Sequence, residues 1–282
     1  MLSDLLDALG APGCGVATAI VMIGQMLVAW QLLRHDPFYA RFGFTARLSS
    51  PHRASLVNLL RLGVPMGLSI AIEVTGFTFM AFFIARIGAM PVAGHQIAVN
   101  LVSLMFMMPL AIANASSTLV AQRIGAGDAA DARRLGWHGL EAGVLIAATM
   151  GAAVYLLREQ ILSLYTHDSI IIGAALPLLA WVAVFHIADA AQTVAAFVLR
   201  AYRMATVPLV IYAVAIWGVG LGGGYALAFD NSGLVPVALR SALGFWSAAT
   251  LGLVIAGIGM SAFLASMLRR SRDRSTALSA AR

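Results

Sequence analysis

Long apolar stretches alternate with short polar segments over almost the whole chain. Seven of these stretches reach the ~20 predominantly apolar residues that a transmembrane helix needs. They lie near residues 12–33, 62–85, 91–121, 137–157, 171–198, 207–228 and 241–267. With 61% hydrophobic and only 11% charged residues, the composition is that of an integral membrane protein. The pattern predicts an all-α, polytopic helical bundle of about seven transmembrane helices in a lipid bilayer.

The charges between the spans predict how the chain is oriented. All 18 basic residues are arginines, and only Arg86, Arg158 and Arg240 fall outside one alternating set of loops and the C-terminal tail. Cytoplasmic loops carry an excess of basic residues, so this set and the C-terminus are predicted to be cytoplasmic. Seven crossings then place the N-terminus outside. Because the basic residues are loop residues, the net charge of +6 does not indicate nucleic-acid binding.

Two carboxylic acids, Glu73 and Asp189, lie inside apolar stretches. At a rise of ~1.5 Å per residue, Glu73 lies roughly 18–20 Å from Arg61 and from Arg86. Asp189 lies roughly 16 Å from Arg200, so both acids are predicted near the bilayer midplane. Ionisable residues at that depth normally line an ion or substrate path. The alternative is that each is a protonated structural acid bonded to a neighbouring helix.

No basic residue is predicted at the depth of these acids. Each acid should therefore be protonated unless a cation is bound. A carboxylate that alternates between a proton, a cation and a substrate is a coupling element. We accordingly predict a cation-coupling site at Glu73 and Asp189, with H⁺ or Na⁺ as the coupling ion and no other cofactor. Sodium at Glu73 and Asp189 is the candidate metal.

Further polar residues within the spans are candidates for the lining of a cavity. His186 and Gln192 each lie three residues from Asp189, and we expect them on its side of the helix. Two others, Gln96 and Asn100, are four residues apart. For the histidines a purely structural role stays open. The candidate lining residues are His95, Gln96, Asn100, His186 and Gln192.

The sequence offers no constellation typical of an enzyme. It contains no lysine, and hence no phosphate-binding loop of the Walker type, and it has no HExxH motif. Its single cysteine, Cys14, excludes an internal disulfide and a cysteine metal cluster. Gly127 and Asp128 predict the end of one helix and the cap of the next. A membrane carrier therefore fits better than an enzyme.

Three stretches of sequence follow one another in an order that is typical of a known protein family. They read LLRLGVPMGLSIAIEVTGF, then GAMPVAGHQIAVNLVSLMFMMPLAIANASSTLVAQRIGAGDAADAR, then AWVAVFHIADAAQTVAAFVLRAY followed by TVPLVIYAVAIW. In this order the chain resembles the multidrug and toxic compound extrusion (MATE) family of cation-coupled exporters. The resemblance implies a carrier with two six-helix lobes. It also implies that Glu73 and Asp189 are acids of the second-lobe cation site and that the substrates are cationic amphipathic small molecules.

By this resemblance the chain is one lobe of the carrier with some flanking sequence. Residues 1–33 would be the last helix of the first lobe, 34–61 a cytoplasmic linker, 62–268 the second lobe and 269–282 a basic cytoplasmic tail. Five helices of the first lobe have no counterpart, so we expect a truncated chain, a misplaced gene start or two half-size proteins that assemble. The partner would be the missing first lobe or a second half-carrier, and the location a bacterial plasma (inner) membrane.

Two other functions stay open. The chain could be a flippase for lipids or lipid-linked oligosaccharides from the same superfamily. Such carriers usually hold phosphate with basic residues in the central cavity, and none is predicted at the midplane. The second alternative is a half-carrier fragment that transports nothing.

Overall fold

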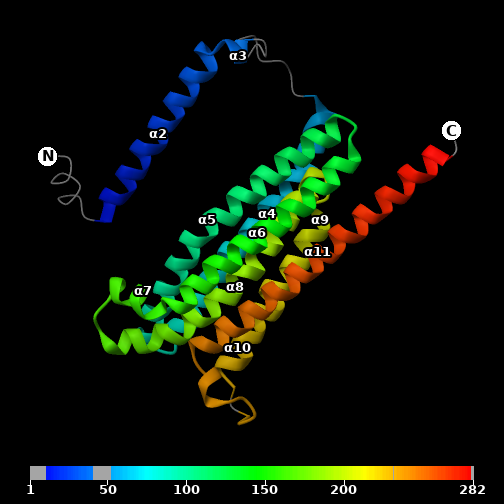
Figure 1. Ribbon diagram of the computed structural model, residues 1–282. Coiled ribbons are helices and arrows are strands. Elements are labelled where there is room, and N and C mark those ends of the chain that lie inside the picture. Colours follow the sequence, from blue (N-terminus) through cyan, green and yellow to red (C-terminus); the bar gives the residue numbers. More distant parts are fainter. Residues whose placement is uncertain (1–10, 41–51, 231, 281–282) are drawn as a thin grey trace. The chain divides into compact units, whose positions relative to one another are not determined.

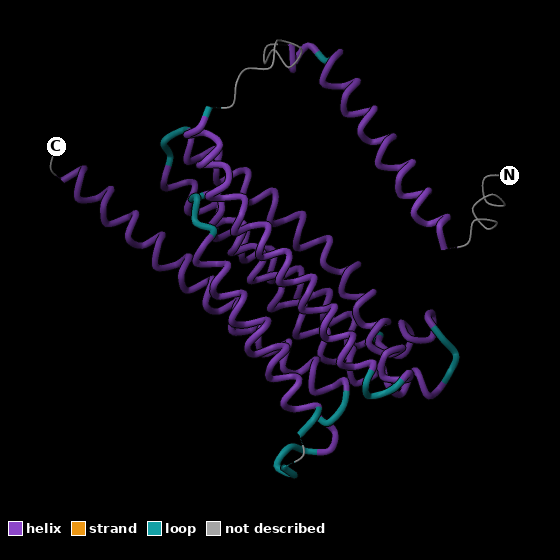
Figure 2. The backbone as a smooth tube through the Cα atoms, turned by 180° about the vertical axis from the view of Figure 1, so that it is seen from behind, coloured by secondary structure: helices purple, strands orange, loops and turns teal. Residues whose placement is uncertain are grey.

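The computed structural model describes residues 11–40, 52–230 and 232–280, and all regular structure in these ranges is helical (Figure 1, Figure 2). The elements are α2 (Ala11–His35), α3 (Pro37–Ala40), α4 (Arg53–Ala85), α5 (Ala89–Gly125), α6 (Ala129–Leu156), α7 (Arg158–Tyr165), α8 (Ser169–Ala201), α9 (Thr206–Ala213), the π-helix η1 (Val214–Gly222), α10 (Gly223–Ala228), the 3₁₀ turn η2 (Val237–Leu239) and α11 (Ala242–Ala280).

The predicted all-α membrane fold is confirmed. Within the described residues, 7 helical segments are long and apolar enough to cross a membrane, and each overlaps one predicted span. Two helices extend further than predicted. α4 begins at Arg53, inside the segment 34–61 that was expected to be a linker, and α11 continues to Ala280, through most of the expected tail. Backbone hydrogen bonding continues past the apolar stretch in both, so hydropathy alone underestimates their length.

The chain divides into two units, residues 1–56 and residues 57–282. In the first, α2 supplies one candidate span, and α3 starts where the Asp36 carboxylate accepts a hydrogen bond from the Phe38 amide at 2.8 Å. Such side-chain capping satisfies an amide that the helix itself cannot. Residues 41–51 of the expected linker, with Pro51, lie outside the described residues, as do residues 1–10, 281 and 282.

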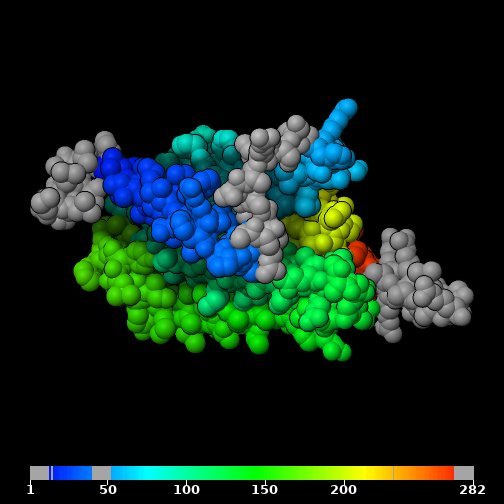
Figure 3. All heavy atoms as spheres, turned by 90° about the horizontal axis from the view of Figure 1, so that it is seen from above, coloured from blue at the N-terminus to red at the C-terminus, as the bar shows by residue number. Residues whose placement is uncertain are grey.

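In the second unit, α8 is the central helix and packs against α5, α6 and α11. Figure 1 shows α5, α6 and α11 running alongside it, and in the space-filling view the side chains of α6 and α7 extend along one side of the unit (Figure 3). Many of the buried positions of α8 are alanines, which let neighbouring backbones approach closely. Close packing here fixes the helix that carries Asp189.

The joint between α5 and α6 forms as its sequence predicts. Gly127 adopts a φ of 80°, a left-handed conformation that glycine adopts without a steric penalty. The Asp128 side chain then accepts a hydrogen bond from the Asp131 amide at 3.0 Å and caps α6. The predicted helix stop and cap are therefore confirmed.

Close contact between α6 and α8 gives a first testable prediction. A β-carbon on Gly151 of α6 would lie 2.8 Å from the carbonyl oxygen of Ala183 on α8, and backbone cannot move aside as a side chain can. Gly151→Ala should therefore destabilise the purified protein by about 1–3 kcal/mol, as overpacking does. Gly173→Ala is the matched control, since a β-carbon there meets nothing within 4 Å. Equal thermal stability of the two variants would contradict this packing.

Candidate functional site

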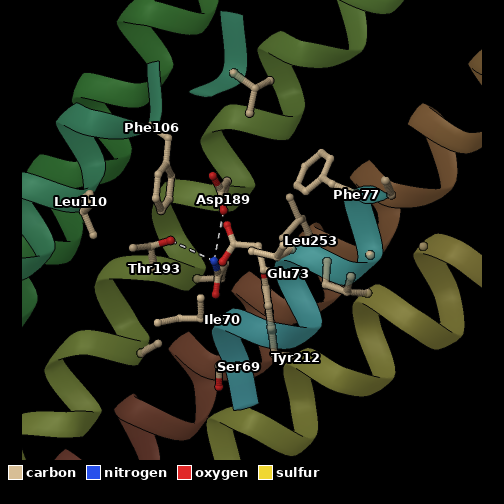
Figure 4. A pocket seen from close by; sticks show the side chains of 18 of the residues that line it. Ser69, Ile70, Glu73, Phe77, Phe106, Leu110, Asp189, Thr193, Tyr212 and Leu253 are labelled. Atoms are coloured by element: carbon tan, nitrogen blue, oxygen red, sulfur yellow. Dashed lines mark hydrogen bonds between the residues drawn. The ribbon is translucent and has the colours of Figure 1, made fainter. Parts of the chain in front are cut away.

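Glu73 on α4 and Asp189 on α8 lie in the wall of one cavity of about 630 Å³. Figure 4 shows both carboxyl groups pointing into the same space from different helices. Asp189 is 4% exposed, whereas Glu73 is half-buried. The two acids are near enough to interact electrostatically. Two residues separated by more than a hundred positions in the sequence thus form one acidic site.

The cavity side of α8 follows from helical spacing. Phe185, Asp189, Gln192, Ala196 and Arg200 all line the cavity. Residues three or four apart fall on one side of an α-helix, so these five form a continuous stripe. The stripe presents an aromatic ring, a carboxylate, an amide, a methyl group and a guanidinium to the same space.

A small polar network holds Asp189 in place. The Nε2 of Gln192 donates to the Asp189 carboxylate at 3.1 Å and to the Thr193 hydroxyl at 2.9 Å. The Tyr212 side chain also lines the cavity and lies next to that of Glu73 (Figure 4). Because buried polar groups need partners, these bonds fix where the Asp189 carboxylate points.

Apart from this network, the cavity is mainly apolar. Its aromatic lining offers ring faces to a bound molecule, and Phe77 and Phe185 pack edge to face with their ring centroids 6.0 Å apart. Flexible methionines, which adapt to ligands of different shape, complete the wall. The lining includes Phe77, Phe106, Phe185, Phe197, Tyr212, Met66, Met80, Met107 and Met260.

Arg200 changes the expected electrostatics. No basic residue was predicted at the depth of the acids, yet Arg200 lines the same cavity and interacts electrostatically with Glu73. Its guanidinium carbon lies 4.2 Å from the centroid of the Phe197 ring, within cation–π range. An arginine side chain is long enough to carry its charge well away from its own backbone position. The acids therefore share their cavity with one fixed cation.

Of the predicted lining residues, only Gln192 lines this cavity. Gln96 and Asn100 are exposed, and the side-chain Oδ1 of Asn100 accepts a hydrogen bond from the Tyr165 hydroxyl at 2.8 Å. His95 is 1% exposed, and its Nδ1 accepts a hydrogen bond from the Trp246 indole at 3.2 Å. Asn100 and His95 thus bond within the bundle, and neither they nor Gln96 line the cavity of the acids.

His186 also lies outside the cavity wall. It is fully buried, and neither of its ring nitrogens has a hydrogen-bond partner among the described residues. Residues three apart differ by about 60° around a helix axis. That angle separates His186, inside the packed protein, from Asp189 on the cavity side. Asp189 and Gln192 thus lie on the cavity side of α8 together with Phe185, whereas His186 does not.

Three residues of the site were missed by sequence reasoning: Thr193, Arg200 and Tyr212. Thr193 directly follows Gln192, and Tyr212 carries a hydroxyl within an otherwise apolar stretch, TVPLVIYAVAIW. A buried tyrosine hydroxyl usually has a partner, which was the available signal for Tyr212. No feature of the sequence near Tyr212 indicates that its side chain lies next to Glu73.

Oxygen-bearing groups around the acids decide which cations the site could hold. Glu73, Asp189, Gln192 and Thr193 all line the cavity and carry side-chain oxygens, the ligands that hard cations prefer. Phe185, one turn before Asp189, offers no oxygen. Within the described ranges, no group of three or more histidine, cysteine, aspartate or glutamate side chains could hold a metal ion. The donor set fits a proton or a weakly held monovalent cation.

Sequence comparison matches residues 65–226 to the family profile described as MatE. The chain is 38% identical over 271 residues to a probable multidrug resistance protein NorM of Aromatoleum aromaticum, covering 96% of this chain and 58% of that protein. It is 35% identical over 255 residues to the multidrug resistance protein MdtK of Pectobacterium atrosepticum, covering 90% and 55%. The chain thus spans little more than half the length of these relatives.

Solved structures give the same fold. The eukaryotic MATE transporter AtDTX14 matches with a TM-score of 0.80 at 17% identity, covering 93% of this chain and 58% of that one. An outward-facing multidrug resistance MATE transporter matches with a TM-score of 0.66 at 14% identity, covering 73% and 44%. The MATE-type fold expected from the sequence is confirmed. This is a multi-pass membrane protein with bacterial relatives, from a family of carriers that are not enzymes. The chain belongs to the MatE family, the multidrug and toxic compound extrusion (MATE) transporters.

Proposed function

We propose that this chain is the second lobe of a cation-coupled multidrug exporter in which Glu73 and Asp189 carry the coupling cation. The observation that supports it best is that these two acids, on different helices, share one cavity with few other polar groups. An acid in apolar surroundings binds a proton or cation readily and releases it when the surroundings change. Such a switch is what coupling requires.

The proposed substrates are cationic amphipathic small molecules. A cavity of about 630 Å³ is of the size that holds drug-sized ligands. Its phenylalanine rings would bind the apolar body and attract a cation through their faces, and the acids would neutralise the charge. The relatives are named as multidrug resistance proteins, which agrees with a broad apolar site.

The coupling ion is proposed to be H⁺ or Na⁺. A proton needs only the carboxylates, whereas sodium would also need oxygens from Gln192 and Thr193. The two ions are separated by loading membrane vesicles with a sodium gradient or a proton gradient alone and following substrate uptake. Transport under a proton gradient without sodium would exclude obligatory sodium coupling.

For the whole carrier we propose the arrangement expected from the sequence. Residues 62–268 would form the second lobe, 1–33 a helix of the first lobe, 34–61 the linker and 269–282 the tail. The protein would lie in a bacterial plasma membrane. Its C-terminus would be in the cytoplasm, because it is on the same side of the membrane as the arginine-rich loops, and such loops are usually cytoplasmic. The relatives contain sequence that this chain does not match, so we propose that transport needs a partner lobe.

A second candidate function, favoured by Arg200, is the flipping of lipids or lipid-linked oligosaccharides. An arginine in the cavity wall supplies the kind of group that holds phosphate. Two acids in the same wall oppose this, since they repel a phosphate. Movement of a fluorescent phospholipid across reconstituted vesicles, without any movement of ethidium, would favour the flippase over the exporter.

Ethidium efflux from cells that lack their own pumps tests the proposed function. One strain expresses this chain alone, and a second also expresses the part of the Aromatoleum relative that the chain does not match. We expect efflux in the second strain, driven by a cation gradient. Efflux in the first strain would show that copies of this chain complete each other. No efflux in either strain, with the protein present in the membrane, would favour a half-carrier that transports nothing.

A further inference from the structure

The span that follows α8 contains an uncommon helix. Between α9 and α10 the backbone forms the nine-residue π-helix η1, with the sequence VAIWGVGLG. π-helical hydrogen bonds run from residue i to residue i+5, and such turns occur frequently at functional sites. The segment therefore needs an explanation beyond crossing the membrane.

The explanation lies in what η1 contacts. The Nε1 of Trp217 donates a hydrogen bond to the carbonyl oxygen of Ile72 at 3.2 Å, and Ile72 directly precedes Glu73 on α4. One turn away, a β-carbon on Gly76 would lie 2.9 Å from the Cγ2 atom of Ile216, so glycine leaves room for this side chain of η1 against α4. The side chain of Tyr212, near the end of α9, lies beside Glu73 in the wall of the cavity (Figure 4). The α9–η1 segment thus holds α4 at Glu73 itself and on both sides of it.

The π-helix makes this double contact geometrically feasible. Tyr212 and Trp217 are five residues apart. In an α-helix, residues five apart differ by about 140° around the axis and cannot both face one neighbour. Tyr212 belongs to the last turn of α9, and the residues from Val214 to Trp217 belong to η1, whose i→i+5 turns rotate less per residue than an α-helix and so reduce this angle. A return of this segment to α-helical geometry would release either Tyr212 or Trp217 from α4.

The Trp217 bond is also costly to break. The Trp217 side chain is 46% exposed on the surface of a membrane-spanning segment, where no water replaces a lost partner. Its ring packs edge to face on Phe79 of α4, with the centroids 6.2 Å apart. Both contacts fix the distance between η1 and α4, but only the hydrogen bond reaches the backbone next to Glu73.

We propose that Trp217 is a positioning residue for Glu73: its hydrogen bond to the Ile72 carbonyl, set by the π-helix η1, holds the acid toward the cavity. The proposal rests on the proposed function, because it assumes that Glu73 binds the cation. In this proposal η1 connects the part of α4 that carries Glu73 to the span that carries Tyr212. It also identifies the contact that must change if α4 and η1 move apart.

Binding of tetraphenylphosphonium to the purified chain tests the proposal. Trp217→Phe keeps a ring against Phe79 but removes the N–H. We expect its affinity to fall about threefold to tenfold, the range for loss of one hydrogen bond. Phe79→Leu, the matched control, removes the ring contact and keeps the N–H, and should change the affinity less than about twofold.

The same substitution in the Glu73→Gln background separates positioning from general structure. If Trp217 acts through Glu73, Trp217→Phe should have almost no further effect there, because residues that act together are not additive. General loosening would weaken binding in both backgrounds. Should Trp217→Phe fail to fold, Trp217→Tyr makes the same comparison, since it also keeps a ring against Phe79 and lacks the indole N–H.

The outcomes distinguish this inference from the proposed function. Weak binding by Glu73→Gln together with unchanged binding by Trp217→Phe overturns the inference and leaves the proposed function standing. An equal loss for Trp217→Phe with and without Glu73 also overturns it. Full affinity of Glu73→Gln would overturn the proposed function and the inference together.

Discussion

Glu73→Gln and Asp189→Asn are each expected to abolish cation-driven ethidium export while the protein still inserts into the membrane. Each amide has nearly the shape of the acid that it replaces, and it can form hydrogen bonds with Tyr212 or Gln192. It cannot take up and release a proton, and it carries no charge for a cation. The substitution therefore removes the coupling chemistry with little change in packing.

The measurement is the rate of ethidium efflux from cells that also express the part of the Aromatoleum relative that the chain does not match, set against the amount of protein in the membrane. We expect the rate of both variants to equal that of cells without the protein. Glu141→Gln is the matched control: it makes the same chemical change at an exposed position of α6 that does not line the cavity. Full coupled efflux by both acid variants would contradict the site. Loss of efflux in Glu141→Gln as well would indicate that the substitutions disturb folding and do not act through the cation site.

The membrane spans could be predicted because their signal is local. A helix that crosses a bilayer needs about 20 apolar residues, and this property is visible in any single stretch of sequence. For the same reason Glu73 and Asp189 could be identified, since an acid inside an apolar stretch is conspicuous without knowledge of its neighbours. The cap at Asp128 is local too.

Contacts between distant residues could not be predicted. Trp217 and Ile72 are 145 residues apart, and His95 and Trp246 are 151 apart, so no pattern within one stretch connects them. His95 looked like a candidate for the cavity because a histidine in a span is unusual. It is instead buried against a tryptophan that only the folded bundle brings near.

Arg200 was missed for a different reason. Counting the helical rise places its backbone roughly 16 Å from Asp189, which is correct for the backbone and misleading for the charge. The cavity extends along the stripe of α8 that faces it, and a long side chain reaches into it. A depth in the membrane that is counted from residue numbers therefore places the carboxylate of an aspartate well, because that side chain is short. It places the charge of an arginine poorly, because that side chain is long.

Neutralising Arg200 is expected to strengthen the binding of cations. Its guanidinium is a fixed positive charge in the wall that also holds Glu73, so it competes with a bound cation for the acid. Two unit charges roughly 10 Å apart, at an effective dielectric constant of about 20, interact by about 1.7 kcal/mol. Removing that repulsion should raise the affinity of Arg200→Gln for tetraphenylphosphonium about tenfold. Arg200→Lys keeps the charge and should stay near the original affinity.

A probe of opposite charge shows whether the effect is electrostatic. Tetraphenylborate has almost the shape of tetraphenylphosphonium but is an anion, so Arg200→Gln should weaken its binding while strengthening that of the cation. A change in the shape of the cavity would move both affinities in the same direction, which would contradict the prediction. Arg203→Gln is the matched control, because Arg203 is exposed and does not line the cavity. Opposite shifts for the two probes, confined to Arg200, would mean that this arginine sets how strongly the acids attract a cationic substrate.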